Sequence, residues 1–381
     1  MPKLMKYIKG RIKQYYERYI KSFMLQQNIF RRNQPFLLNE LFGKKIIPFV
    51  KHLKRSDVEY LKYLFSKHTD FLSKKHNRKA NFFFFWGLSF GKKNIGIIRK
   101  ALSTKIPVYY IECGWFYNVF SHLHEGKVDK KYNTCLSFLI DDLGFYFDAN
   151  NVSRLEQMLN DKNLVITDEQ KARARNCIDF IVKNKISKFN NASSEYQIKQ
   201  NGRKKILVID QNVNDMSILC GMANGDTFSK MITSAIQDND DADIYIKIHP
   251  LSILLHNNHY QSFNSQRVIH ITENVNIISL ICQMDEVYVC TSQVGFEALM
   301  CGKAVHTFGM PFYAGYGLTN DYLINERRTN KRTIEELFYI AYIMYCKYVN
   351  PDTQKHCEIE DCLTYLVKNR DEYFNSLKSN N

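Results

Sequence analysis

The sequence lacks cysteine pairs at the spacing of a redox or metal-binding motif. Its ten cysteines are scattered along 381 residues, with no CxxC pair and no zinc-finger spacing among them. Scattered cysteines are typical of reduced thiols in a cytosolic protein, whereas small secreted domains use closely spaced cysteines as a disulfide framework. We therefore expect no disulfides and no structural metal.

Long apolar runs are also missing. No stretch approaches the roughly 20 apolar residues of a membrane-spanning helix. The N-terminus has neither the uninterrupted apolar core nor the small-residue cleavage site of a signal peptide. These absences argue against an integral or secreted protein, so we expect a cytoplasmic location.

The N-terminal segment 1–33 has a pattern of its own. Apolar side chains recur there at helical spacing and basic side chains fill the other faces: Leu4, Ile8, Ile12, Tyr15, Tyr19 and Phe23 against Lys6, Lys9, Lys13, Arg18 and Lys21. The pattern predicts a basic amphipathic helix. Such a helix can lie on an anionic membrane surface, and Arg31 and Arg32 favour this reading. The alternative is that the apolar stripe packs on the protein's own body.

The chain has neither the composition of a disordered protein nor an excess of acidic residues. Hydrophobic residues make up 45% of the chain and charged residues 24%, and the length allows two domains with buried cores. The net charge of +15 predicts anionic partners. Nucleic acid is not expected among them, because no recognised nucleic-acid-binding motif occurs and the basic residues concentrate at the N-terminus.

Short apolar runs alternate with helix-like stretches, the pattern of βαβ units and parallel sheets. The expected strands are 81–86, 108–112, 137–140, 206–210, 244–248, 268–271, 286–290 and 304–308, and the expected helices are 57–66, 95–102, 152–159 and one that starts with 296–301. A polar stretch at 183–205 separates the two halves. We divide the chain into the segment 1–33, a first domain 34–200, a second domain 201–332 and C-terminal helices 333–381.

Three segments of the second half have the composition of a ligand site. Residues 291–299, T-S-Q-V-G-F-E-A-L, follow a predicted strand and open a helix, where backbone N–H groups can face a phosphate. The alternative is an ordinary N-cap at Ser292. Lys247 and His249 end another strand at its carboxyl edge, where they can neutralise a departing phosphate. Residues 309–319 combine glycines with aromatics, which suits either a ligand-stacking loop or a rigid loop with buried rings.

Together, residues 247–250, 291–299 and 311–319 resemble the bacterial capsule polysaccharide biosynthesis proteins, the β-Kdo transferases that build the Kdo linker on capsule lipid anchors. The sequence P-F-Y-A-G-Y-G-L-T at 311–319 is the most specific of these motifs. The likeness covers about residues 80–325, because further segments are similar to the family. These segments are W-G-L-S at 86–89 followed by Lys92-Lys93, residues 111–116, residues 137–149 and the Gln-x-x-x-Asp turn within 210–218.

Some features depart from the family. Cys113 stands where the family usually has Asp, and residues 117–124 lack its Arg-Ser continuation. Many members carry two catalytic modules in one chain, whereas this chain has room for one.

The resemblance implies an α/β protein of the GT-B type, with two Rossmann-like domains facing a cleft and helical segments at both termini. It implies transfer of Kdo from CMP-Kdo to a glycan or glycolipid acceptor, with retention through a covalent sugar–enzyme adduct. Asp215 is the candidate nucleophile, Asp210 the competing one, and Glu112 the candidate general base. His249 is the third catalytic candidate. The candidate donor-binding residues are Lys247, Ser292, Gln293, Gly295, Glu297, Gln211, Ser89 and Lys92.

No metal ion or other cofactor is expected. CMP leaves as a monophosphate ester, which cationic and hydrogen-bonding side chains can stabilise. The acidic residues Asp141-Asp142 and Asp238–Asp243 are interpreted as structural and solvated segments. Within enzymes the alternative is an inverting CMP-sialic acid transferase, because bacterial ones also pair an acidic-Gly turn with a His-Pro dipeptide. Outside enzymes, a scaffold of capsule assembly and a nucleic-acid- or membrane-binding protein remain as alternatives.

Overall fold

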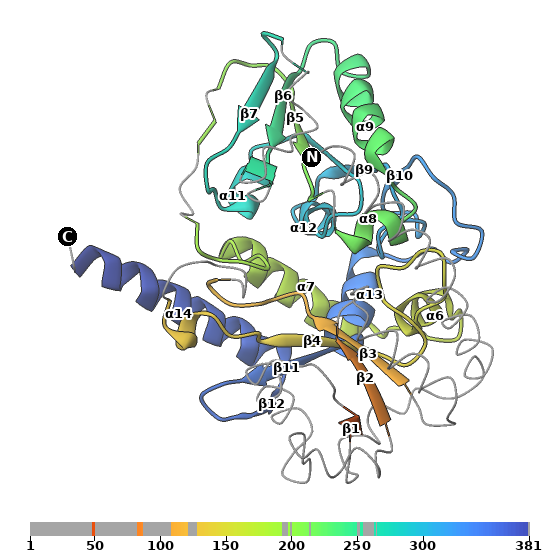
Figure 1. Ribbon diagram of the computed structural model, residues 1–381, viewed down its shortest axis with the longest axis vertical. Helices are drawn as coiled ribbons and strands as arrows, with labels where there is room; N and C mark the ends of the chain where they lie inside the picture. Colours follow the sequence, from red (N-terminus) through yellow and green to blue (C-terminus); the bar gives the residue numbers. More distant parts are fainter. Residues whose placement is uncertain are drawn as a thin grey trace.

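The computed structural model describes residues 48–49, 82–86, 108–120, 128–192, 197–198, 200–212, 215–249, 252–253, 263 and 265–379. Within these ranges the strands form two six-stranded sheets, which lie one above the other in Figure 1. The α/β class expected from the sequence is confirmed. The segment 1–33 and the expected helices 57–66 and 95–102 lie outside the described residues.

The second sheet is parallel throughout, with strand order β10-β9-β8-β5-β6-β7. Its strands are β5 (Lys205–Ile209), β6 (Asp243–Lys247), β7 (Val268–Ile271), β8 (Glu286–Val289), β9 (Ala304–Thr307) and β10 (Asn320–Asp321). This is the strand order of a Rossmann sheet. All strands stay parallel, but the order in which they follow one another across the sheet reverses between β5 and β8. Ligands of such sheets bind outside the carboxyl ends of the strands at this reversal.

Short helices connect the strands of the second sheet: α8 (Met216–Cys220), α9 (Gly225–Gln237), α11 (Ile277–Ile281) and α12 (Val294–Met300). Helix α9 illustrates why they form. Its side chains Phe228, Met231, Ile232 and Ala235 recur at helical spacing and are buried. Asn224 accepts hydrogen bonds from the first-turn N–H groups of Asp226 and Thr227, which fixes the start of the helix.

The first sheet is mixed, with strand order β1-β2-β3-β4-β11-β12. Its strands are β1 (Pro48–Phe49), β2 (Phe82–Trp86), β3 (Val108–Cys113), β4 (Ser137–Asp141), β11 (Cys346–Asn350) and β12 (Lys355–Cys357). Strands β1 to β3 run parallel, whereas β4 pairs antiparallel with both β3 and β11. The parallel sheet expected for this half is therefore only partly correct. In the described part of the β3–β4 connection the helical element is the short 3-10 helix η4 (Lys130–Tyr132), whereas parallel strands are usually joined through an α-helix.

Helices lie around the first sheet and between the sheets in Figure 1. The helical elements of this part of the molecule, besides η4, are α6 (Arg154–Asn160), α7 (Asp168–Lys183), α13 (Ile334–Phe338), the π-helix η5 (Tyr339–Tyr345) and α14 (Ile359–Ser379). The sequence analysis did not predict α7, although Thr167 and Gln170 form a capping box at its start. One continuous apolar core includes side chains from both sheets, for example Leu139 and Val287.

The C-terminal part of the chain completes the first sheet. Residues 333–381 contain the expected helices, and they also contain β11 and β12, which the sequence analysis did not predict. The π-helix η5, which lies between α13 and β11, makes a contact with the first half of the chain. Its Ala341 carbonyl accepts a hydrogen bond from Trp115 Nε1 at 2.9 Å, so the C-terminal part of the chain anchors the turn that follows β3.

None of the helices in the described ranges has both the length and the apolar composition needed to cross a membrane.

Candidate functional site

The carboxyl edge of the second sheet gathers several predicted site residues. Asp210 and Gln211 follow β5, Lys247 ends β6 with His249 just beyond it, and Ser292 follows β8. Since the strands are parallel, their carboxyl ends lie at the same edge of the sheet. The structure therefore brings together residues that are up to 82 positions apart in the sequence, from Asp210 to Ser292.

Gln211 and Thr291 join β5 and β8 at the point where the strand order reverses. Gln211 Oε1 accepts the backbone N–H of Thr291 at 2.9 Å, and Gln211 Nε2 donates to Thr291 Oγ1 at 3.1 Å. A Cβ on Gly309 would lie 2.6 Å from Thr291 Cγ2, and a Cβ on Gly221 would lie 2.4 Å from it. Thr291 is thus enclosed by two glycine backbones. The sequence analysis selected Gln211 and missed Thr291, although Thr291 lies within the motif 291–299.

The two candidate nucleophiles differ in their surroundings. Asp210 is buried, and its Oδ2 accepts the backbone N–H of His249 at 3.0 Å. Asp215 is exposed and forms the N-cap of α8, where its Oδ1 accepts the N–H of Ser217 at 2.9 Å. Asp210 therefore holds the segment that carries His249, whereas Asp215 is accessible to a ligand.

Lys247 and His249 are polar groups in a largely buried setting. Burial lowers the pKa of Lys247, and the charges of Glu273 and Asp210 act in the opposite direction. Burial also lowers the pKa of His249; Asp215 raises it and Lys247 lowers it further. His249 is therefore neutral at pH 7 and lies within electrostatic range of Asp215.

The first sheet contributes Glu112, which lies near the end of β3, and Tyr146, which follows β4. Burial raises the pKa of Tyr146 well above its usual value, and the next largest causes are the charges of Glu112 and Asp215. The candidate base of the first sheet and the candidate nucleophile of the second thus both act on the pKa of one tyrosine.

The segment 291–294 connects this site to the first sheet. Gln293 Nε2 donates to the Trp115 carbonyl at 3.1 Å, three residues beyond Glu112. Ser292 Oγ accepts the N–H of Val294 at 3.2 Å, but the N-cap of α12 is Gln293, one residue beyond the position expected as the alternative to ligand binding. The Ser292 carbonyl accepts the Tyr313 hydroxyl at 2.6 Å.

Gly295 and Glu297 have packing contacts in the structure. A Cβ on Gly295 would lie 2.1 Å from the Tyr313 hydroxyl oxygen, so this ring needs a glycine beside it. Glu297 is buried, and its Oε1 accepts the Ser187 hydroxyl at 2.8 Å. Burial raises the pKa of Glu297 to about 7. Contact of these two residues with a donor stays a prediction.

The rings of the loop 309–319 are buried, so the rigid-loop alternative describes it and the stacking-loop reading does not. Phe312, Tyr313 and Tyr316 are each at most 4% exposed. Phe312 packs on Trp115 with ring centroids 4.5 Å apart. Gly315 adopts a φ of +85°, as expected for a turn that needs glycine.

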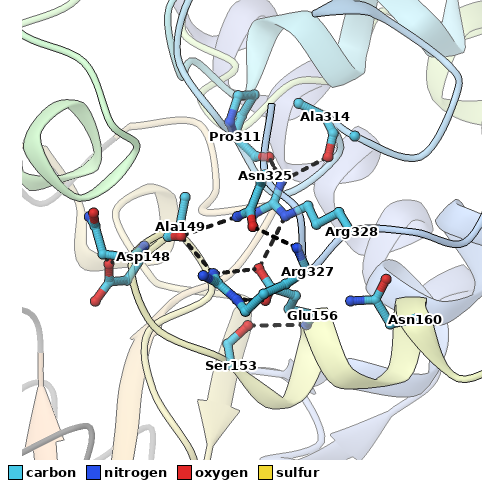
Figure 2. A network of polar contacts seen from close by, with 12 residues as sticks. Asp148, Ala149, Ser153, Glu156, Asn160, Pro311, Ala314, Asn325, Arg327 and Arg328 are labelled. Carbon is cyan, nitrogen blue, oxygen red and sulfur yellow. Dashed lines mark hydrogen bonds and ion pairs between the residues drawn. The ribbon is translucent and has the colours of Figure 1, made fainter. Parts of the chain in front are cut away.

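An ion-pair network around the buried pair Glu156–Arg328 holds the loop 309–319 in place, as Figure 2 shows. Arg328 donates to the carbonyls of Pro311 and Ala314 through Nη1, and its Nε donates to Glu156 Oε2 at 3.1 Å. Arg327 Nε donates to the other oxygen of Glu156 at 2.7 Å. The sequence analysis did not identify Glu156, Arg327 or Arg328, because a contact between α6 and a loop 170 residues away leaves no local pattern.

The acidic pair Asp141-Asp142 is structural, as interpreted from the sequence. Asp142 forms a bidentate ion pair with Arg154, with distances of 2.9 and 2.7 Å. Asp141 accepts hydrogen bonds from Leu143, Gly144, Arg154 and Tyr345. Within the described residues no group of three or more His, Cys, Asp or Glu side chains could hold a metal ion. Ser89 and Lys92 lie outside the described residues.

Known proteins with similar sequences are connected with bacterial surface polysaccharides. Residues 86–351 match the family described as capsule polysaccharide biosynthesis protein. The capsule polysaccharide modification protein LipA of Neisseria meningitidis serogroup A is 37% identical over 243 residues, which cover 61% of this chain and 34% of LipA. The lipopolysaccharide-processing protein LpsZ of Rhizobium meliloti is 30% identical over 294 residues, which cover 75% of this chain and 63% of LpsZ. The chain thus spans about a third of the length of LipA.

Solved structures show the same architecture. Thermosulfurimonas dismutans KpsC, described as a β Kdo 2,4 transferase, is similar with a TM-score of 0.74 and 31% identity, over 85% of this chain and 98% of that one. The KpsC β Kdo 2,7 transferase of the same organism shares the fold, with a TM-score of 0.61 and 24% identity. The GT-B fold expected from the motifs is confirmed. Because the family match spans more than half of the chain, this protein belongs to the capsule polysaccharide biosynthesis protein family.

Proposed function

We propose that this protein is a glycosyltransferase that transfers Kdo from CMP-Kdo to a glycan or glycolipid acceptor in surface polysaccharide synthesis. The observation that carries the proposal is the gathering of Lys247 and His249 at the carboxyl edge of the second sheet, where β5 leads to the exposed carboxylate of Asp215. A transferase that works through a covalent adduct needs a nucleophile and a base, and Asp215 and Glu112 are the candidates for these roles. The choice of Kdo rests on the likeness to the β Kdo 2,4 transferase.

In the first step an oxygen of Asp215 attacks the anomeric carbon of Kdo. The bond from this carbon to the phosphate oxygen breaks, and CMP leaves with the electron pair. Lys247 and His249 lie at the same sheet edge and stabilise the charge that develops on the phosphate. Because His249 is neutral at pH 7, it acts as a hydrogen-bond donor rather than as a cation.

In the second step the acceptor hydroxyl attacks the anomeric carbon of the adduct. Glu112 takes the hydroxyl proton, and the bond from the sugar to Asp215 breaks. Two displacements at one carbon give net retention. Support for Asp215 over Asp210 comes from their surroundings, because Asp215 is exposed while Asp210 is buried and accepts the N–H of His249.

In this proposal the acceptor binds on the side of the first sheet, because the candidate base Glu112 lies in β3. We infer that the acceptor is a glycan or glycolipid and that the basic segment 1–33 brings the protein to the inner face of the membrane where such acceptors are made. This location rests on the sequence pattern alone.

The test is nucleotide release. The protein is incubated in turn with CMP-Kdo, CMP-sialic acid and UDP-sugars, and free CMP or UDP is measured. We expect release from CMP-Kdo, loss of this release in Asp215→Asn, and no loss in Asp226→Asn, which changes an exposed carboxylate of α9. Release from CMP-sialic acid with an inverted product would favour the sialyltransferase alternative, and release from UDP-sugars alone would overturn the proposed donor class.

A further inference from the structure

Helix α8, which begins at the candidate nucleophile Asp215, is too short to hold its own position. It comprises the five residues Met216–Cys220, with Asp215 as its N-cap. Helices shorter than about 12 residues are marginal in water, because the first turn fixes many dihedral angles for few hydrogen bonds. Contacts with the rest of the molecule must therefore fix the direction of the Asp215 carboxylate.

The C-terminal end of α8 is held by contacts to its last carbonyl groups. The N–H of Ala149 and the side-chain Nδ2 of Asn150 both donate to the Cys220 carbonyl, each at 2.9 Å. The carbonyl of the next residue, Gly221, accepts the N–H of Met310 at 2.7 Å. These contacts hold the end of the helix and do not reach its first turn.

The first turn of α8 is in contact with Thr291, a buried residue two positions beyond β8. Thr291 Oγ1 lies 3.3 Å from Ser217 Oγ, and the backbone N–H of Ser217 donates to Asp215 Oδ1 at 2.9 Å. Gln211 Nε2 donates to Thr291 Oγ1 at 3.1 Å, so the hydroxyl proton of Thr291 can itself be donated to Ser217. A chain of printed contacts thus leads from β8 to the carboxylate.

The methyl group of Thr291 fixes the direction of its hydroxyl. A Cβ on Gly221 would lie 2.4 Å from Thr291 Cγ2, and a Cβ on Gly309 would lie 2.6 Å from it. The methyl group therefore fills a space between two glycine backbones. Because a β-branched side chain is already restricted at χ1, this packing holds Oγ1 toward Ser217.

We propose that Thr291 is a positioning residue for the transfer reaction, because its contact with Ser217 fixes the first turn of α8 and thereby the Asp215 carboxylate. The inference rests on the proposed function, in which Asp215 attacks the anomeric carbon. A displaced nucleophile attacks slowly even when the donor is bound, since attack requires the reacting atoms to be aligned near contact distance. Loss of the Thr291 hydroxyl should therefore lower kcat and leave donor affinity nearly unchanged.

The test separates the two groups that Thr291 carries on its Cβ. Thr291→Val keeps the shape and removes the hydroxyl, whereas Thr291→Ser keeps the hydroxyl and removes the methyl group. CMP release from CMP-Kdo with a soluble acceptor is measured at a temperature at which both variants are folded. In Thr291→Val, kcat should fall by about tenfold or more with KM within about threefold, and Thr291→Ser should keep kcat within about threefold.

The matched control is another buried threonine of the same sheet. Thr307 is fully buried at the end of β9, and its hydroxyl donates to Asp321 Oδ1 at 2.7 Å. Thr307→Val loses a buried hydroxyl that has no contact with α8 among its printed partners. Its kcat and KM should stay within about twofold of the unaltered protein, even if its stability falls.

A double-variant cycle tests the contact itself. Ser217→Ala removes the second hydroxyl and keeps the N–H that Asp215 accepts, so it should lower kcat as Thr291→Val does. The double variant should be no slower than Thr291→Val, because the two hydroxyls act through one contact.

Three results overturn the inference: similar kcat losses in Thr291→Val and Thr291→Ser, a raised KM with unchanged kcat, or independent losses that add in the double variant. If Thr291→Val does not fold, Ser217→Ala decides, and a kcat within about twofold of the unaltered protein overturns the inference. Absence of any release from CMP-Kdo by the unaltered protein overturns the proposed function instead, so the two failures are distinguishable.

Discussion

Arg328 and Glu156 form a buried ion pair between the loop segment after β10 and the helix α6. Both residues are less than 8% exposed, and the guanidinium also donates to the carbonyl of Ala314 at 2.8 Å. The pair therefore fixes the loop 309–319, whose Phe312 packs on Trp115. It connects the two sheets without touching any candidate catalytic residue.

Glu156→Gln should destabilise the protein by roughly 3–5 kcal/mol, because it leaves the buried guanidinium of Arg328 and the partly exposed one of Arg327 without their carboxylate. The measurement is the free energy of unfolding from denaturant titration. Arg173→Gln is the control, since Arg173 pairs with Glu358 and Glu360 on a more exposed surface, and it should cost less than about 1 kcal/mol. Equal losses of unfolding free energy in the two variants would show that burial does not increase the contribution of the Glu156 ion pairs to stability.

His249→Ala should lower turnover by about 100-fold or more while the fold survives, because a group that stabilises the leaving phosphate contributes several kcal/mol to the transition state. Turnover is measured as CMP release from CMP-Kdo, and the fold by circular dichroism. His356→Ala, at an exposed position in β12, should leave turnover unchanged. A folded His249→Ala protein with near-normal turnover removes His249 from the site.

Glu297→Gln should flatten the pH dependence of stability. Burial raises the pKa of Glu297 from 4.5 to about 7 in the folded protein. The folded state therefore holds a proton that the unfolded state has lost, and stability present below pH 4.5 is lost as the pH rises toward 7. The effect is on the order of 3 kcal/mol. The measurement is the unfolding free energy of both proteins from pH 4.5 to 7.5, and parallel curves would contradict the prediction.

Glu112→Gln should slow acceptor activation more than donor attack. Incubation of this variant with CMP-Kdo should then leave a Kdo adduct on the protein, detectable by intact mass, and peptide analysis should locate it on Asp215. An adduct on Asp210 would correct the assignment of the nucleophile. An inverted product without any adduct would overturn the covalent mechanism.

Deletion of residues 1–33 should weaken binding to vesicles that contain anionic lipid and should spare transfer to a soluble acceptor, because the predicted helix supplies only membrane affinity. Vesicle co-sedimentation and CMP release measure the two effects. Neutral vesicles are the control for charge. If the truncated protein is insoluble or inactive on the soluble acceptor, the segment packs on the protein's own body.

Five of the six strands of the second sheet could be predicted closely from the sequence, because each is a short apolar run between polar residues, and the run 268–271 coincides with β7. The sixth strand, β10, is the polar pair Asn320–Asp321 and was not predicted. The gathering of Lys247, His249 and Ser292 at one edge then follows from parallel strands. What the sequence could not provide is the burial of side chains, so it did not distinguish the buried Asp210 from the exposed Asp215 by structure.

The errors of the sequence analysis concern contacts between distant segments. Residues 346–350, C-K-Y-V-N, follow an apolar stretch that continues a helical pattern, and their partner β4 lies about 200 positions earlier. The aromatic loop 309–319 is similar, because its rings are buried by Trp115 and held by Arg328 rather than by neighbours in sequence. Local periodicity carries no information about such partners.

The pairing of β11 with β4 affects how the chain can assemble and be recombined. The strands of the second sheet come from residues 205–321, an unbroken stretch that can form its sheet as soon as it is synthesised. Strand β4 pairs with residues 346–350, so one edge of β4 stays unpaired until that later part of the chain has been made. An exchange of acceptor specificity between relatives cannot therefore transplant residues 34–200 alone. The graft must carry β11, β12 and α14 along with them, as two pieces of sequence that form one sheet.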